Sequence, residues 1–383
     1  MDRDAFSTRQ KRYVVRAEGG YSAFVPPPLP PEIPLSADLV RKLSDADRAI
    51  GELAGLGRSL PNPHLLSRAL MRREAVLSSR IEGTQASLSD LVLFELEPER
   101  DSADVREVYN YLQAVDHVLA PDRRLPVSLS LLREAHRILL AGTRGSHAEP
   151  GEFRRTQNWI GSPGAVIDTA KYVPPPPERL WECLDPFEKF LHADGELPPL
   201  ITIGAIHYQF EAIHPFIDGN GRVGRLLVVL LMVEWGLLPA PLLDLSAYIE
   251  PRRDAYYQGL LNVSRDGDWA GWLSFFLDVV ANQARDALAR AQALHDLRKQ
   301  MRRDVASSRA SGSLMQLVDA LFDVPMLTIP RARDVLGITH RAATLNVEKL
   351  VDFGLLREIR HGGRPRLFVA REVMRVVESD RLS

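Results

Sequence analysis

The stretch "HPFIDGNGRVGRLLVVLLMVEWGLL", residues 214–238, places glycines and charged residues directly before a strongly apolar run. Its "GNGRVG" has the G-x-G-x-x-G spacing of a dinucleotide-binding turn, and that turn requires a β-strand immediately before the first glycine. The preceding "ITIGAIHYQFEAIHPFID", residues 201–218, instead repeats apolar residues at helical spacing. The segments on both sides are therefore predicted to be helices, and a dinucleotide-binding βαβ unit is rejected.

The glycines of this stretch still predict an anion site. The turn at 219–221 can expose consecutive backbone N–H groups to an anion. A helix predicted over 222–236 directs its positive N-terminal end to the same place. Arg222 and Arg225 lie three residues apart and so share one face of the first turn, and guanidinium groups bind phosphate oxygens in bidentate fashion. Together these features predict a polyphosphate-binding site.

Two further residues of the stretch carry chemistry. Asp218 is a hard oxygen ligand, suited to hold Mg²⁺ through bound phosphates rather than in a protein cage. His214, which the following Pro215 is predicted to fix in extended backbone, is a candidate general base. Each of these residue types alone is common in ordinary loops and helix faces. A base, a metal ligand, an anion site and two arginines within residues 214–225 together predict phosphate chemistry.

The segment "HPFIDGNGRVGR" resembles the signature of Fic-domain enzymes, H-P-F-x-[D/E]-G-N-G-R-x-x-R, with every specified position filled. The Pro-rich leader at 24–34 and the segment at 151–177, which ends in "YVPPPP", are similar to those of Fic proteins with an N-terminal extension. The resemblance covers about the first three quarters of the chain. It implies a mainly α-helical Fic-fold bundle with a short β-hairpin flap.

The resemblance implies transfer of AMP from ATP to a Ser, Thr or Tyr hydroxyl of a target protein, with release of pyrophosphate. His214 would deprotonate the hydroxyl, and Asp218 would hold Mg²⁺ or Mn²⁺ on the α- and β-phosphates. Arg222 and Arg225 would grip the β- and γ-phosphates, with Asn220 near the α-phosphate. The implied ATP-binding residues are Gly219, Asn220, Gly221, Arg222, Val223, Gly224, Arg225 and Tyr257.

By the same resemblance, an aromatic residue after the signature should line the adenine site. Tyr256 and Tyr257 are the candidates, and Tyr257 is favoured, although both could equally be core residues. The flap near Trp159 and Ile160 would pair with an extended target segment by β-augmentation.

A second motif, "SSRIEG", fits the pattern [S/T]-x-x-x-E-[G/N] of the inhibitory helix of many Fic proteins, with Ser78 and Glu82 at its defining positions. Glu82 is predicted in the last turn of a helix, where the negative end of the dipole favours an outside cation. The hypothesis is that Glu82 pairs with Arg225 and removes one γ-phosphate ligand. The alternative is a solvated glutamate beside Arg80.

The C-terminal segment predicts a winged helix-turn-helix. Two helical stretches meet at Gly337, and "REIRHGGRPRLFVA", residues 357–370, alternates and turns as a two-stranded wing would. Residues 331–383 hold eleven Lys/Arg and seven Asp/Glu, a net charge of +4. DNA binding and use for dimerisation or target docking are both open. The candidate DNA contacts are Arg341, Asn346 and Lys349 on the second helix and Arg360, Arg364 and Arg366 on the wing.

The sequence thus predicts four parts. These are an N-terminal Fic-associated region (1–104) with the inhibitory helix (62–83), a catalytic domain with its following helices (105–300), a polar linker (301–313) and the winged helix-turn-helix (314–383). A single cysteine, Cys183, suits a reducing cytosol. The net charge of -2 shows no overall attraction to nucleic acid or membranes. The apolar run at 226–243 is interrupted by a glutamate and two prolines, so it is predicted to be a buried core helix.

Several alternatives are weighed against AMP transfer. The related γ-phosphate transfer resembles a shorter signature without Arg225, and de-AMPylation would use Glu82 to position a water. A nucleotide-sensing DNA-binding regulator would not need His214 as a base. A metal hydrolase built on His207, His214 and Asp218 is weaker, since helix packing explains His207 equally well. Besides a target protein, the resemblance makes the chain itself and a homodimer candidate partners.

Overall fold

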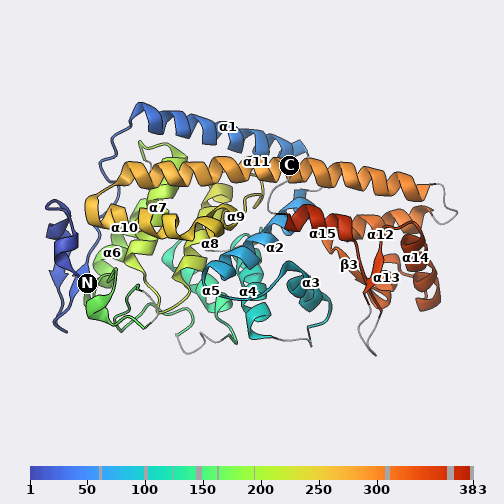
Figure 1. Cartoon of the computed structure of the whole chain (residues 1–383), viewed down its shortest axis with the longest axis horizontal. Coiled ribbons are helices and arrows are strands. Elements are labelled where there is room, and N and C mark those ends of the chain that lie inside the picture. Colours follow the sequence, from blue (N-terminus) through green and yellow to red (C-terminus); the bar gives the residue numbers. More distant parts are fainter. Residues whose placement is uncertain are drawn as a thin grey trace.

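The computed structural model describes residues 1–59, 63–98, 102–123, 125–143, 149–161, 164–193, 195–306, 311–359 and 366–379. The described chain is mainly α-helical, as predicted (Figure 1). Its helices are α1 (Ala37–Ser59), α2 (Pro63–Ile81), α3 (Leu88–Leu96), α4 (Ala103–Val118), α5 (Leu129–Leu139), α6 (Leu180–Leu191), α7 (Pro199–Ile213), α8 (Asn220–Glu234), α9 (Ser246–Ile249), α10 (Arg253–Asp266), α11 (Trp269–Ala306), α12 (Ser311–Asp323), α13 (Ile329–Leu336), α14 (His340–Asp352) and α15 (Arg371–Glu378). Its strands are β1 (Val14–Arg16), β2 (Ser22–Phe24), β3 (Met326–Thr328), β4 (Arg357–Ile359) and β5 (Leu367–Val369).

The centre of the bundle is the pair α7 and α8, which frames the signature loop. Every residue of α7 except Pro199 and Glu211 is buried, and most of α8 is buried as well. A helix that is apolar all round belongs in a core, so the run at 226–243 begins as a core helix, as predicted. No helix in the described ranges is long and apolar enough to span a membrane.

Helices α1 and α11 cover one side of this centre and lie along one another (Figure 1). α11 presents a stripe of buried residues at steps of four and three, which is the spacing of one helix face. Its members are Trp272, Phe276, Val280, Ala284, Ala287 and Ala291. The same helix then continues beyond the bundle toward the C-terminal unit, defined here as residues 311–379.

The structure corrects the expected polar linker at 301–313. α11 extends to Ala306 and α12 begins at Ser311, so the helices enter this range from both ends. Met301 and Val305 explain the extension, because these apolar residues one turn apart are buried in the core of the C-terminal unit. That unit contains α12, α13 and α14 and an antiparallel sheet of order β3-β5-β4. The wing tip at 360–365, with Arg360 and Arg364, lies outside the described residues.

The expected β-hairpin flap is very short. Within the described part of 151–177, pairing is limited to one antiparallel bridge between Ile160 and Tyr172. The prolines that follow lack the N–H groups that a strand ladder needs, and the Gln157 side chain donates instead to the carbonyl of Pro174 at 3.1 Å. Side-chain bonds to the backbone therefore replace a second strand. The structure also contains β1, β2, α3 and α15, which the sequence analysis did not predict.

The C-terminal unit is fastened to α2, the helix that carries the predicted inhibitory motif. Arg73 of α2 donates to Asp244 at 2.5 Å and to Asp286 at 3.1 Å, and Arg290 of α11 donates to the same Asp286. Arg290 also donates to the carbonyl of Ser379 at 2.6 Å, directly after α15. Both guanidinium groups are buried, so the segment that ends at Ser379 packs against the helix that ends next to the signature loop.

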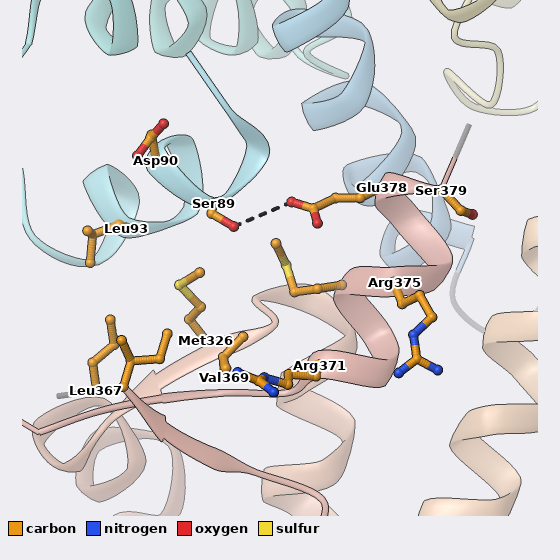
Figure 2. A pocket seen from close by; sticks show the side chains of 12 residues that line it. Ser89, Asp90, Leu93, Met326, Leu367, Val369, Arg371, Arg375, Glu378 and Ser379 are labelled. Carbon is orange, nitrogen blue, oxygen red and sulfur yellow. Dashed lines mark hydrogen bonds between the residues drawn. The ribbon is translucent and has the colours of Figure 1, made fainter. Parts of the chain in front are cut away.

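A cavity of about 610 Å³ lies between α3 and the C-terminal unit. Figure 2 shows its apolar side chains from β3, β5 and α15 facing α3, with Ser89 hydrogen-bonded to Glu378 across it. None of the predicted catalytic or ATP-binding residues lines this cavity. Its lining residues are Ser89, Asp90, Leu93, Met326, Ile359, Leu367, Val369, Arg371, Met374, Arg375, Glu378 and Ser379.

Candidate active site

His214 ends α7 in a backbone conformation that the sequence did not predict. Its φ is 50° and its ψ 60°, in the left-handed region, whereas Pro215 was expected to impose an extended conformation. The helix end explains the difference, because the His214 N–H donates to the Phe210 carbonyl at 2.9 Å and closes the last turn. A left-handed residue other than glycine costs about 1–2 kcal/mol, and such strain is typical of functional sites.

The surroundings of His214 keep its imidazole neutral. Burial lowers its pKa to about 4, and the positive charge of Arg154 acts in the same direction. Nδ1 lies 3.3 Å from the carbonyl oxygen of Glu211. Because a carbonyl only accepts, this contact places the proton on Nδ1 and leaves the lone pair on Nε2. A neutral imidazole with a free Nε2 lone pair can accept a proton from a hydroxyl group.

Arg154 holds the backbone beneath His214 and was missed by the sequence analysis. It is buried, its Nε donates to the His214 carbonyl at 2.9 Å, and its own backbone N–H donates to the Pro215 carbonyl at 2.9 Å. An Nη2 bond to Pro175 at 2.5 Å ties the same guanidinium to the proline-rich segment. An arginine among irregular residues gave no spacing signal that could have identified this role.

The loop itself is closed by two side chains. Asn220 binds the backbone of Phe216 twice, with Oδ1 accepting from its N–H at 2.9 Å and Nδ2 donating to its carbonyl at 2.8 Å. His136 of α5 donates from Nε2 to the Asp218 carbonyl at 2.9 Å, because its Nδ1 accepts from the Gly151 N–H. The Asn220 side chain is thus bound within the loop. The sequence signal for His136 was a polar residue on the buried face of an amphipathic helix.

The N-terminus of α8 faces the loop with the predicted anion-binding groups. Gly219 is the N-cap residue with φ of 79°, and it supplies no side chain to the free N–H groups of the first turn. Arg222 is buried, and its Nε and Nη1 have no hydrogen-bond partner among the described residues. Free backbone donors and a buried guanidinium at one helix N-terminus favour a phosphate ligand.

Asp218 is exposed at the edge of this anion site. Its Oδ1 accepts from the Gly219 N–H at 2.6 Å, which fixes the carboxylate beside the start of α8. In the described ranges, no group of three His, Cys, Asp or Glu side chains could by itself hold a metal ion. A single hard carboxylate next to a phosphate site fits Mg²⁺ or Mn²⁺ held mainly by phosphate oxygens.

Arg225 is bound by the residues of the predicted inhibitory motif. Its Nε donates to the Ser78 hydroxyl at 2.9 Å, its Nη2 donates to the Ser78 carbonyl at 3.0 Å, and Nη2 lies 2.8 Å from Glu82 Oε1. The guanidinium is 1% exposed and the Glu82 side chain 32% exposed. A side chain on Gly221 would collide with the Glu82 carboxylate, so this carboxylate lies directly over the first turn of α8. The expected contact between Glu82 and Arg225 is present.

The two candidate tyrosines occupy different environments. Tyr256 is buried, and its hydroxyl is hydrogen-bonded to His207 Nε2 at 2.8 Å. Tyr257 is 41% exposed. Burial raises the pKa of the Tyr257 hydroxyl, the negative charge of Glu82 raises it further, and the positive charge of Arg225 opposes both. Of these two tyrosines, Tyr257 is therefore the one with an exposed aromatic surface. His207 also contacts the Gly224 carbonyl at 3.1 Å, so both its nitrogens are engaged and cannot bind a metal.

The predicted DNA-contact residues differ in their exposure and in the contacts they already make. Arg341 is exposed at the start of α14 and Lys349 is half-buried on the same helix. Asn346 donates to the Ala342 carbonyl within the helix at 2.9 Å. Arg366 forms ion pairs with Glu348 at 3.0 Å and Glu358 at 2.9 Å, and both carboxylates raise the pKa of its guanidinium. These pairs would have to break before Arg366 could contact a phosphate.

Comparison with known proteins agrees with this geometry. Residues 40–120 match the model described as Fic/DOC family N-terminal, and residues 126–232 match that described as Fic/DOC family. The protein adenylyltransferase Fic of Drosophila grimshawi is 32% identical over 161 residues, which is 41% of this chain and 29% of that protein. The protein of the same name in Drosophila persimilis is 31% identical over 41% of this chain and 28% of its own length. The chain thus spans less than a third of these relatives.

Solved structures show the same fold. A Fic family protein from Desulfovibrio desulfuricans G20 superposes with a TM-score of 0.59 at 21% identity, over 89% of this chain and 98% of that chain. Fic-1 from C. elegans gives a TM-score of 0.52 at 24% identity, over 68% and 74%. The chain thus contains one segment similar to the Fic/DOC family N-terminal region and one similar to the Fic/DOC family, and it shares the fold of these Fic proteins.

Proposed function

We propose that the chain transfers AMP from ATP to a hydroxyl group of a target protein. The observation that carries this proposal is the single loop that joins a neutral His214 to the anion-binding N-terminus of α8. A base for a hydroxyl proton and a site for several phosphates are the two requirements of nucleotidyl transfer. The curated relatives are named protein adenylyltransferases, which supports the proposal.

In the proposed reaction, His214 Nε2 accepts the proton of the target hydroxyl as its oxygen attacks the α-phosphorus of ATP. The bond from the α-phosphorus to the bridging oxygen breaks, and pyrophosphate leaves with the electron pair. Arg222, Arg225 and the first N–H groups of α8 stabilise the charge that develops on the phosphates. Asp218 would hold Mg²⁺ or Mn²⁺, which supplies further charge neutralisation when bound. Tyr257 offers an aromatic surface for adenine.

We also propose that Glu82 inhibits this reaction. Its carboxylate occupies the Nη2 side of Arg225 and covers Gly221, where the phosphates would meet the first turn of α8. A carboxylate and a phosphate compete for the same donors, and their like charges repel. ATP would therefore bind without its γ-phosphate on Arg225, in a pose that does not align the α-phosphorus with the attacking oxygen.

The test of the proposed function is incubation of the protein and its Glu82→Gly variant with Mg²⁺ and ATP labelled at either the α- or the γ-phosphate. Label on protein only from α-labelled ATP supports AMP transfer. Label only from γ-labelled ATP would establish phosphate transfer instead, and Arg225 would then serve a kinase. Release of label from a pre-modified target would identify de-AMPylation.

The pH dependence of the reaction should reflect the lowered pKa of His214. A base with pKa about 4 stays neutral down to pH 5.5, whereas an ordinary histidine with pKa about 6.5 would be roughly 90% protonated there. We therefore expect the initial rate of AMP transfer by the Glu82→Gly variant to change less than twofold between pH 7.5 and 5.5. A tenfold fall centred near pH 6.5 would contradict the assigned environment of His214.

For the C-terminal unit, we infer a winged helix-turn-helix that contacts duplex DNA through α14. Its element order and the exposed Arg341 support this inference, while the ion pairs of Arg366 restrict the contribution of the wing. Phosphate contacts release counterions, so we expect DNA affinity to fall steeply between 50 and 200 mM salt. The measurement is a titration of labelled duplex DNA at several salt concentrations. No binding at low salt would assign the unit to protein contacts.

A further inference from the structure

Arg222 has an ionic partner that the proposed inhibition by Glu82 does not include. Glu107 of α4 lies with Oε2 3.7 Å from Arg222 Nη1, and the two side chains are 12% and 4% exposed. At this distance the two side chains form an ion pair but no hydrogen bond. Removing one partner of a buried pair leaves the other charge uncompensated. Glu107 therefore supplies the negative charge that the buried Arg222 requires when no phosphate is present.

Thr84 holds Glu107 in this position. The Thr84 hydroxyl donates to Glu107 Oε2 at 2.7 Å, which is the same oxygen that faces Arg222. Thr84 is buried two residues after Glu82, in the segment that follows the inhibitory helix. The hydroxyl helps to fix Oε2 where it lies 3.7 Å from Arg222 Nη1. The ion pair stays long, and a bidentate phosphate can displace it.

We propose that Glu107 is the counterion of Arg222 in the nucleotide-free protein, and that a phosphate of ATP replaces it. Both arginines of the signature are then matched by carboxylates before ATP binds, Arg225 by Glu82 and Arg222 by Glu107. Arg225 has a short hydrogen-bonded pair at 2.8 Å, whereas Arg222 has a long one. This inference goes beyond the Glu82 contact and rests on the proposed function only in taking ATP as the ligand.

The proposal makes two opposite predictions for ATP affinity, both in the Glu82→Gly background so that Glu82 does not contribute. Adding Glu107→Gln removes a competing charge close to the phosphates, so ATP should bind about tenfold tighter. The same change should lower the melting temperature without nucleotide, because Arg222 loses its counterion. Adding Thr84→Val removes one hydrogen-bond donor from Glu107 Oε2, so Glu107 should compete more strongly for Arg222 and ATP should bind more weakly. The measurements are calorimetric titration with Mg²⁺ and ATP, and thermal unfolding without ligand.

The matched control is Glu95→Gln in the same background. Glu95 is also 12% exposed and pairs with the buried Arg72 at 2.9 Å, but it lies on α3 outside the signature loop. It should lower the melting temperature and leave ATP affinity unchanged. Unchanged or weaker ATP binding by Glu107→Gln would overturn the proposal, since a merely structural or orienting residue gives that result.

Inorganic pyrophosphate serves as a second probe, because it tests the anion exchange without the nucleoside. If the Glu82→Gly parent binds pyrophosphate but not ATP, the proposed function fails while the counterion exchange is still measured with Glu107→Gln. If the parent binds pyrophosphate and its affinity does not rise in Glu107→Gln, the counterion role fails and the proposed function stands. Failure of the parent to bind either probe would overturn both.

Discussion

The Glu82→Gly variant is expected to transfer AMP about 10- to 100-fold faster than the unmodified protein. The change frees Nη2 of Arg225 and uncovers the first turn of α8, where Glu82 now lies over Gly221. A hydrogen bond to a charged group contributes about 1.5–3 kcal/mol, and each 1.4 kcal/mol is a factor of ten in rate. The measurement is the initial rate of label transfer from α-labelled ATP at fixed protein and target concentrations.

The control for this variant is Arg80→Gly. Arg80 is an exposed residue in the last turn of α2, two residues before Glu82, so its replacement by glycine loosens the helix end without removing the carboxylate from Arg225. Its rate should stay within a factor of two of the unmodified protein. An equal increase in both variants would show that a looser helix, and not the loss of the carboxylate, causes the activation. A Glu82→Gly protein that stays folded and is no faster would refute the inhibitory role.

Loss of His214 is expected to have the largest effect of any single change in the active site. In the Glu82→Gly background, His214→Ala should lower the rate of AMP transfer by about 10²–10⁴-fold, because general-base catalysis contributes that much. ATP affinity should stay within a factor of two, since the phosphates are held by α8 and the arginines. The measurements are single-turnover label transfer and calorimetric titration with ATP.

Backbone strain needs its own control at this position. His214 has φ of 50°, and asparagine adopts this region more readily than alanine. His214→Asn should therefore be as inactive as His214→Ala while losing less thermal stability. His117→Ala, which removes a half-exposed histidine paired with Glu134 at 2.8 Å, should retain full activity. More than a tenth of the parental rate in either His214 variant would exclude this residue as the base.

Much of the signature loop could be predicted because its determinants are local. Gly219 supplies the positive φ, and Arg222 and Arg225 share a helix face by their spacing alone. The contact of Glu82 with Arg225 joins residues 143 positions apart, and only the resemblance to a known motif suggested it. Local rules also produced the error at His214, where Pro215 disfavours a helical conformation but does not prevent a left-handed one.

The supporting residues could not be predicted, because their roles depend on distant backbone. His136 reaches the Asp218 carbonyl from 82 positions away, and Arg154 reaches the His214 carbonyl across 60. In the sequence, each is a single polar residue without a spaced partner. The flap was predicted from its β-forming residues, but the prolines after Val173 removed the donors that a second strand would have needed.

The continuous helix α11 fixes how the C-terminal unit is rotated relative to the helical bundle. The helix has 38 residues, about 57 Å at 1.5 Å per residue, and it enters the core of the C-terminal unit before it ends. One inserted or deleted residue before Met301 would turn that unit by about 100° about the helix axis. The bond from Arg290 to Ser379 could not follow such a rotation. The length of α11 therefore determines which face of the C-terminal unit packs against α2.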